Sequence, residues 1–372
     1  MGFQSSTVED LAMSTPAQLN PEFWRNKRVL LTGHTGFKGS WLSLWLQSLN
    51  TRLCGIALEP PTEPAMFRIA QVASGMEHHL ADIRDFSSIQ KIMMDFEPEI
   101  VIHMAAQSLV RYSYQFPIDT YAINVMGTAH VLEAARHAKS VRAIVNITTD
   151  KCYENREWVW GYRESDPMGG HDPYSSSKGC AELLSDAYRK SFLAASGISL
   201  ATARAGNVIG GGDWADERLI PDILRALEHE EAPSIRNPHA IRPWQHVLEP
   251  LSGYLLLAER LHEFGTSYAE SWNFGPSDED TRPVQWVAER LCRDWGTDTS
   301  WQPQPGKHPH EANFLKLDTS KARQRLRWTP RWTLETAIEH VVKWHKARLD
   351  HQDMRTVCLQ QIKAYDQSVV GM

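Results

Sequence analysis

A tyrosine and a lysine four positions apart, Tyr174 and Lys178, have the types and spacing of a general base and its charged partner. Residues at i and i+4 of a helix lie on the same face. An ammonium about 4 Å from the phenol would attract its charged form by roughly 4 kcal/mol at an effective dielectric near 20, or about three pKa units. We therefore expect the pKa of Tyr174 to fall from about 10 toward about 7, which suits a base at neutral pH.

Three glycines, Gly33, Gly36 and Gly39, form a second pattern, one that could bind a cofactor. They stand between a strand-like apolar run and a helical pattern, where glycine permits a tight turn and close approach of the backbone to a pyrophosphate. An ordinary strand-to-helix turn is the alternative. Glu59 follows the second apolar run, where a ribose-binding carboxylate would sit, although it could equally be solvated. The context predicts a dinucleotide cofactor and favours NAD over NADP.

Alternating strand and helix patterns supply the scaffold that must position these residues. Apolar runs of strand length alternate with helical spacing over more than the first half of the chain. The expected strands are 27–33, 52–58, 100–106, 143–148 and 199–204, and the expected helices are 40–46, 86–96, 120–138 and 174–196. Continuous apolar strands are typical of a parallel sheet that is covered on both faces. The sequence thus predicts an α/β fold with a Rossmann-type doubly wound parallel sheet.

Composition excludes several classes of function. The net charge of −6, from 39 basic and 45 acidic residues, is spread along the chain, so we expect no nucleic-acid partner. The five cysteines form no CxxC or Cys/His ligand pattern, so we expect reduced thiols and no metal site. No apolar run reaches membrane-spanning length and no signal peptide is recognisable, so we expect a soluble, cytoplasmic protein without a membrane partner.

Several motifs occur in the order and spacing of one known family. These motifs are Thr32-Gly33 with Gly36 and Gly39, Met104 to Gln107, Asn124, Thr148 to Asp150, and Tyr174 with Lys178. From about 28 to 247 the chain resembles the extended short-chain dehydrogenase/reductase family. Lys38 and the runs 149–153 and 236–247 make it similar, within that family, to nucleotide-sugar 4,6-dehydratases, most closely those that act on CDP-glucose.

The resemblance implies an internal redox elimination that gives a 4-keto-6-deoxy sugar and water. Tyr174 would take the proton of the C4 hydroxyl, Lys178 would hold Tyr174 in its basic form, and Thr149 would orient the C4 oxygen. Asp150 would be the general acid for the departing C6 hydroxyl, for which burial should raise its pKa. Lys151 would either remove the C5 proton or act through its charge, with a slight preference for the first role. A solvated surface pair is the alternative for Asp150 and Lys151.

The resemblance also implies two sets of binding residues. The NAD site would consist of Gly33, Thr35, Gly36, Phe37, Lys38, Gly39, Asp82, Ile83, Ala105, Ala106, Gln107, Asn124, Thr148, Tyr174 and Lys178. Asp82 could instead cap the helix that starts near Phe86. Asn207 and Arg242 would bind the nucleotide diphosphate, and His246 would line the nucleotide pocket, although core packing is an equal alternative for His246. Arg204 could merely pair with a nearby acid.

We expect five segments along the chain. They are a mobile extension at 1–25, the NAD-binding domain at 26–206 with a strand and helix near 243–275 returning to it, a smaller substrate-binding region at 207–242 and 276–350, and a C-terminal tail at 351–372. Relatives are commonly dimers, which would use the helices around 110–135 and 174–196. The product would feed deoxysugar synthesis for an outer polysaccharide such as O-antigen. A sugar-nucleotide 4-epimerase and a non-catalytic NAD-binding regulator are the competing interpretations.

Overall fold

A seven-stranded parallel sheet forms the centre of the computed structural model, which describes residues 16–216, 218–304 and 315–368. From one edge to the other its strands are β11 (Ser271–Phe274), β6 (Ser199–Ala205), β5 (Ala143–Ile147), β4 (Ile100–His103), β1 (Arg28–Thr32), β2 (Arg52–Ala57) and β3 (Glu77–Leu80). The chain starts in the middle and builds outward, first to one edge and then to the other. This order confirms the predicted doubly wound sheet.

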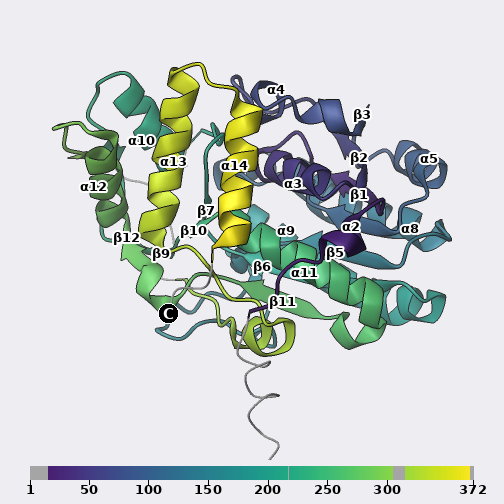
Figure 1. The fold of residues 1–372 in the computed structure, drawn as a ribbon. Helices are drawn as coiled ribbons and strands as arrows, with labels where there is room; N and C mark the ends of the chain where they lie inside the picture. Colours follow the sequence, from purple (N-terminus) through teal and green to yellow (C-terminus); the bar gives the residue numbers. More distant parts are fainter. Residues whose placement is uncertain (1–15, 217, 305–314, 369–372) are drawn as a thin grey trace, which may run out of the picture.

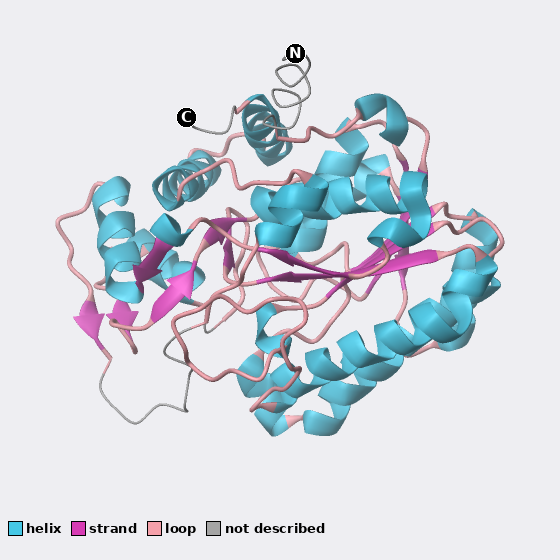
Figure 2. Ribbon diagram, turned by 90° about the horizontal axis from the view of Figure 1, so that it is seen from below, coloured by secondary structure: helices cyan, strands magenta, loops and turns pink. Residues whose placement is uncertain are grey.

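Helices cover both faces of this sheet, as Figure 2 shows. One face carries α3 (Phe37–Ser48) and α11 (Leu248–Phe264), and the other carries α5 (Phe86–Phe96), α8 (Thr128–His137) and α9 (Pro173–Tyr188). Side chains that alternate along β1 divide between two hydrophobic cores, with Val29 and Leu31 in one and Leu30 in the other. This two-sided burial is the reason that the strands read as continuous apolar runs.

The two long helices predicted at 120–138 and 174–196 are present with local irregularities. A π-helical turn at Ala122–Gly127 joins α7 (Pro117–Tyr121) to α8, and another at Arg189–Leu193 extends α9. The other short elements are α2 (Pro21–Trp24), α4 (Met66–Ile69), α6 (Val110–Gln115), the π turn Ala322–Leu326 and the 3₁₀ turns Val72–Gly75, Asp150–Cys152, Ala194–Ser196, Gly265–Tyr268 and Asp278–Asp280. Within the described residues, no helix combines the length and the apolar character needed to cross a bilayer.

A separate hydrophobic core forms beyond the sheet from later parts of the chain. It contains α10 (Leu219–Glu228), α12 (Val284–Trp295) and α13 (Leu334–Leu349). Three two-stranded sheets complete this region: β7 (Val208–Ile209) with β10 (Gln245–His246), β9 (Ile241–Pro243) with β12 (Thr281–Pro283), and β8 (Ser234–Ile235) with β13 (Gln302–Pro303). The assignment of substrate binding to this region stays a prediction.

The N-terminal segment differs from the expected mobile extension. Residues 1–15 lie outside the described part of the chain, but Trp24 is completely buried and its Nε1 donates a 2.6 Å hydrogen bond to Glu259 of α11. The backbone N–H of Asn20 donates to the same carboxylate at 2.9 Å. The prediction was therefore wrong for residues 16–25, because a buried tryptophan anchors them to α11.

The C-terminal segment also differs from the expected tail, because it forms α14 (Met354–Gln367), beside α13 in Figure 1. Tyr365 is completely buried, and its hydroxyl donates a 2.6 Å hydrogen bond to Glu249 of α11. Arg331 donates to the backbone oxygens of Tyr365 at 3.1 Å and Ala17 at 3.5 Å. The prediction overlooked an apolar face with helical spacing, which consists of Met354, Cys358, Ile362 and Tyr365.

Candidate active site

The glycine loop joins β1 to α3. Its three glycines differ in how much space a side chain would have at each position. Gly33 has a φ of +79°, and a Cβ there would lie 2.8 Å from the backbone nitrogen of Ala105. A Cβ on Gly39 would overlap the backbone oxygen of Gly33. A Cβ on Gly36, in contrast, would meet only Gly33 O, at 3.5 Å. The packing of the protein therefore requires Gly33 and Gly39, whereas Gly36 leaves open space in front of the helix.

The N-terminus of α3 faces this open space without a side-chain cap from the described residues. Uncapped backbone N–H groups and the helix dipole favour an anionic group such as a pyrophosphate. Next to it, the hydroxyl of Thr35 donates to the backbone oxygen of Leu58 at 2.9 Å, which ties the loop to the end of β2. The residues present therefore fit the pyrophosphate of a dinucleotide.

Lys38 lies in the first turn of α3, and Phe37 precedes it. The Nζ of Lys38 donates to the hydroxyl of Tyr254 on α11 at 3.1 Å. Burial, together with the charges of Lys178 and Arg218, lowers the pKa of Lys38 to about 7 against the opposing charge of Asp150. Lys38 thus connects the glycine loop with the groups expected to perform the chemistry.

The region expected to bind adenine is held by local contacts. Asp82 accepts hydrogen bonds from the backbone and side chain of Arg84, at 2.8 Å for the backbone N–H. The alternative that Asp82 caps the following helix is wrong, because Asp85 accepts from the N–H groups of the first turn of α5. Ile83 is buried, close to Gly127. The adenine assignment of Asp82 and Ile83 stays a prediction.

Asn124 holds the loop that follows β4, which contains Ala105, Ala106 and Gln107. Its Oδ1 accepts from the backbone N–H of Gln107 at 2.9 Å, while its Nδ2 donates to Gln107 O and to the hydroxyl of Ser177, both at 2.9 Å. Ser177 precedes Lys178 on α9. The amide of Asn124 therefore fixes the position of this loop relative to the helix of the Tyr/Lys pair.

Tyr174 and Lys178 lie one turn apart on α9, and both are buried. Asp172 caps this helix by accepting from the N–H of Ser175 at 3.0 Å, so the start of the helix is fixed. Burial lowers the pKa of Lys178 to about 8, and its Nζ donates to the backbone oxygen of Ile147 at 3.2 Å. The sequence thus predicted the pairing of these two residues on one helix correctly.

The expected low pKa of Tyr174 is not found. Burial raises the pKa of Tyr174 to about 12, which outweighs the lowering effects of a hydrogen bond with Thr149 and of the charge of Arg218. Lys178 is not among the groups that lower it. The prediction was wrong because it counted Coulomb attraction in a uniform dielectric and neglected the loss of solvation on burial.

The turn Asp150–Cys152 follows β5 and faces the Tyr/Lys pair. Thr149 Oγ1 donates to Asp150 Oδ1 at 3.0 Å and accepts from the backbone N–H of Lys151 at 3.3 Å. As expected, burial raises the pKa of Asp150, while the charges of Lys151 and Arg242 oppose the increase. Asp150 is therefore not half of a solvated surface pair.

The side chains on either side of Thr149 and Asp150 point to different surroundings. Lys151 is exposed, and its charge acts on Asp150. The role of Lys151 at C5 stays a prediction. The hydroxyl of Thr148 donates to Glu182 at 2.5 Å, and its contact with a cofactor stays a prediction.

The three residues predicted to bind the substrate are not equivalent. Asn207 follows β6, and Arg242 lies on β9, close enough to Asp150 for its charge to lower that pKa. His246 is completely buried, its ring packs against those of Trp332 and His340, and its Nδ1 accepts from a backbone N–H. The prediction that His246 binds substrate was wrong, and the packing alternative holds.

Arg218 is a functional candidate that the sequence analysis missed. It pairs with Asp213 at 2.9 Å and donates to the hydroxyl of Ser108 at 3.2 Å. Its charge lowers the pKa values of Tyr174 and Lys38, so it lies near the pair that the sequence did identify. It stands in an irregular segment before α10, where no periodic pattern marks it.

Comparison with known proteins agrees with this geometry. The family model for GDP-mannose 4,6 dehydratase matches residues 30–341, well over half of the chain. The chain belongs to the GDP-mannose 4,6 dehydratase family. Within this family, it is 54% identical to the CDP-glucose 4,6-dehydratase of Salmonella typhimurium over 352 residues, which cover 93% of this chain and 98% of that relative.

Solved structures with the same fold include dTDP-glucose 4,6-dehydratases and sugar-nucleotide 4-epimerases. A dTDP-glucose 4,6-dehydratase from Streptomyces venezuelae, with NAD bound, has a TM-score of 0.76 at 20% identity and covers 88% of this chain and 99% of its own. A UDP-glucose 4-epimerase from Thermotoga maritima, with UDP-glucose, also has a TM-score of 0.76 at 21% identity and covers 86% and 99%. At these identities the likeness shows the fold.

Proposed function

We propose that the protein converts CDP-glucose to CDP-4-keto-6-deoxyglucose and water, as an NAD-dependent hydro-lyase. One observation carries the chemistry: a buried carboxyl with a raised pKa, Asp150, lies beside the buried Tyr174 and Lys178. The nucleotide is supported by the 54% identity to a CDP-glucose 4,6-dehydratase over nearly the whole of both chains. The uncapped N-terminus of α3 and the space at Gly36 support NAD.

NAD, when bound, supplies a hydride acceptor for C4 of the sugar and a hydride donor for C6. Tyr174 takes the proton of the C4 hydroxyl, and the hydrogen bond with Thr149 and the charge of Arg218 favour the resulting phenolate. Lys178 binds the ribose of the nicotinamide half of NAD. Because the 4-ketone acidifies the C5 proton, Lys151 takes that proton as the C6 hydroxyl leaves, and it gives the proton back to C5 when hydride returns to C6. Asp150, whose raised pKa favours its protonated form, gives a proton to the departing hydroxyl.

The second candidate, a sugar-nucleotide 4-epimerase, needs the Tyr/Lys pair but no acid that expels a hydroxyl. The buried Asp150 counts against it. The deciding experiment incubates the purified protein and NAD with CDP-glucose, dTDP-glucose, UDP-glucose and GDP-mannose, and follows the loss of one water by mass. Loss of water from CDP-glucose alone supports the proposal. Loss from another sugar keeps the reaction and overturns the nucleotide, and epimerisation without water loss supports the second candidate.

We further propose a cytoplasmic homodimer that supplies a deoxysugar pathway for an outer polysaccharide. Exposed apolar side chains on α6, α7, the π turn after it and α9 support the dimer. They are Tyr114, Phe116, Ile118, Met126 and Leu183. Light scattering tests the dimer, and Leu183→Arg should turn it into a monomer.

A further inference from the structure

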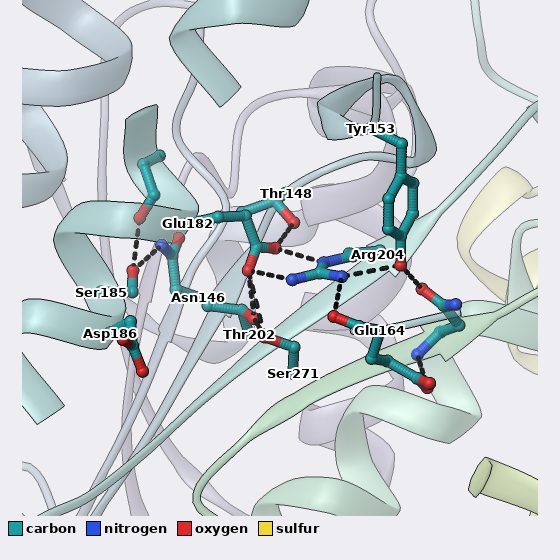
Figure 3. A network of polar contacts seen from close by, with 12 residues as sticks. Asn146, Thr148, Tyr153, Glu164, Glu182, Ser185, Asp186, Thr202, Arg204 and Ser271 are labelled. Carbon is teal, nitrogen blue, oxygen red and sulfur yellow. Dashed lines mark hydrogen bonds and ion pairs between the residues drawn. The ribbon is translucent and has the colours of Figure 1, made fainter. Parts of the chain in front are cut away.

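A network of polar groups, most of them buried, surrounds Glu182 and Arg204, as Figure 3 shows. Its centre is the ion pair between Glu182 on α9 and Arg204 on β6, whose side chains are each 3% exposed. Arg204 Nε and Nη2 donate to the two carboxylate oxygens of Glu182 at 2.8 and 2.7 Å. The carboxylate also accepts from the hydroxyls of Thr148, Thr202 and Ser271. Arg204 therefore does pair with an acid, which was the alternative given for it.

The third nitrogen of the same guanidinium points to the turn that carries Asp150. Arg204 Nη1 donates to the hydroxyl of Tyr153 at 2.7 Å and to the backbone oxygen of Glu164 at 3.2 Å. The hydroxyl of Tyr153 in turn donates to Asn273 Oδ1 at 2.7 Å. Tyr153 is 1% exposed and stacks on Tyr162, so both its ring and its hydroxyl are fixed.

Both partners of Arg204 are close in sequence to catalytic residues. Glu182 follows Lys178 by one turn of α9, and its charge raises the pKa of Lys178 against the effect of burial. Tyr153 directly follows the turn Asp150–Cys152. One planar guanidinium with a rigid set of donors therefore spans the two parts of the active site that carry separate chemical steps.

We propose that Arg204 is a positioning residue that holds the α9 pair of Tyr174 and Lys178 at a fixed distance from Asp150. This inference rests on the proposed function and adds to it a division of labour. Glu182 supports the step at C4, because it is tied to the helix of Tyr174. Tyr153 supports the loss of the C6 hydroxyl, because it is tied to the turn of Asp150. A buried ion pair adds little net stability by itself, so position is what it contributes.

Tyr153→Phe separates the two steps, because it removes one hydroxyl and keeps the ring. In a single turnover of CDP-glucose, we expect the loss of water to slow by about tenfold, while formation of the 4-ketone stays within about threefold. The 4-keto sugar that still carries its C6 hydroxyl should then accumulate, which a mass measurement on quenched samples detects. Glu182→Gln should give the opposite pattern, with slower formation of the 4-ketone and no accumulation.

Tyr365→Phe is the matched control, since it also removes a buried phenol hydroxyl with a polar partner. This hydroxyl belongs to α14 and donates to Glu249. It should lower the melting temperature without changing the ratio of the two steps. If Tyr153→Phe behaves in the same way, or slows both steps equally, the network is only structural and the inference is overturned. Arg204→Lys, which keeps the charge but cannot span both partners, should slow both steps.

Hydrogen exchange tests positioning without any substrate. In Tyr153→Phe, the amides of residues 149–153 should exchange at least tenfold faster relative to the rest of the sheet, whereas Tyr365→Phe should leave them unchanged. Faster exchange that is uniform over the molecule would overturn the inference. If the wild-type protein forms neither the 4-ketone nor the dehydrated product, the proposed function is overturned. The hydrogen-exchange result still tests whether the network positions residues 149–153, because it needs no substrate.

Discussion

Thr149 donates its hydroxyl to the carboxyl group of Asp150 across 3.0 Å, and both side chains are buried. The same threonine forms a hydrogen bond with Tyr174, which lowers the pKa of the phenol against the larger effect of burial. One hydroxyl therefore lies between the base expected at C4 and the acid expected at C6. When a sugar enters, this hydroxyl must exchange one of these partners for the C4 oxygen.

Replacement of Asp150 by asparagine should separate oxidation from elimination. Asp150→Asn keeps an acceptor for Thr149 but has no proton to give, so we expect water loss to slow by about 10²- to 10⁴-fold while the 4-ketone still forms. The measurement is product mass over time with CDP-glucose. Glu154→Gln, an exposed acid that is close in sequence, is the control and should be close to wild type. An equal slowing of both steps would contradict the acid role.

Tyr174→Phe should abolish the step at C4 itself. Without the phenol oxygen no group is left to take the hydroxyl proton, so we expect the rate of 4-ketone formation to fall by about 10²- to 10⁴-fold. Tyr188→Phe, on the same helix and only partly buried, is the matched control and should retain activity. Turnover of Tyr174→Phe near the wild-type rate would show that another group is the base.

Substitution of the glycines should distinguish a binding role from a packing role. Gly36→Ala should fold normally, because the new Cβ would lie 3.5 Å from its nearest neighbour, yet weaken NAD binding by at least about tenfold because it fills the space in front of α3. Gly39→Ala should destabilise the protein, because its Cβ would overlap Gly33 O. Calorimetry of NAD binding together with thermal unfolding checks both. Unchanged NAD affinity in Gly36→Ala would argue against the pyrophosphate assignment.

Two buried acids of α11 should make stability depend on pH. Burial raises the pKa of Glu249 and of Glu259 from 4.5 to about 7 in the folded protein. The folded state thus holds protons more tightly than the unfolded state. The stabilisation is complete below about pH 4.5 and is lost as the pH rises through about 7, by up to about 3 kcal/mol for each acid.

Glu259→Gln removes one of these titrations while it keeps an oxygen acceptor for Trp24. The melting temperature of this variant should therefore fall less than that of wild type between pH 5 and pH 8. Glu22→Gln, which changes an exposed acid close in sequence to Trp24, serves as the control and should follow wild type. Identical pH profiles for wild type and Glu259→Gln would mean that Glu259 titrates normally.

Local patterns were sufficient to predict β1, β2, β4, β5 and β6, the glycine loop and the Tyr/Lys helix. They did not predict β3, whose side chains are mostly exposed and form no apolar run. A parallel strand that is buried on both faces is apolar along its whole length. For this reason β1, β4 and β5 can be predicted from the sequence alone. The motifs of the resemblance then supplied the order of the site residues. These features depend mainly on residues that are close together in the sequence.

Properties that depend on distant packing were not predictable in this way. The raised pKa of Tyr174 arises from burial by elements that are far away in the sequence, and the burial of His246 depends on Trp332 and His340. Arg218 lies in an irregular segment, so only its position next to Tyr174 marks it. The apolar residues of α14 do have helical spacing in the sequence, so this helix could have been predicted.

Arg331, described above for its contacts with Ala17 and Tyr365, has a practical consequence for protein engineering. Because one guanidinium binds backbone oxygens from both end regions of the described chain, these regions form a single local unit. Truncation at either end should therefore weaken the other. Conversely, a circular permutant that links the two end regions and opens the chain at an exposed loop would keep these contacts. Such a permutant should therefore fold like the original chain although its elements are connected in a different order.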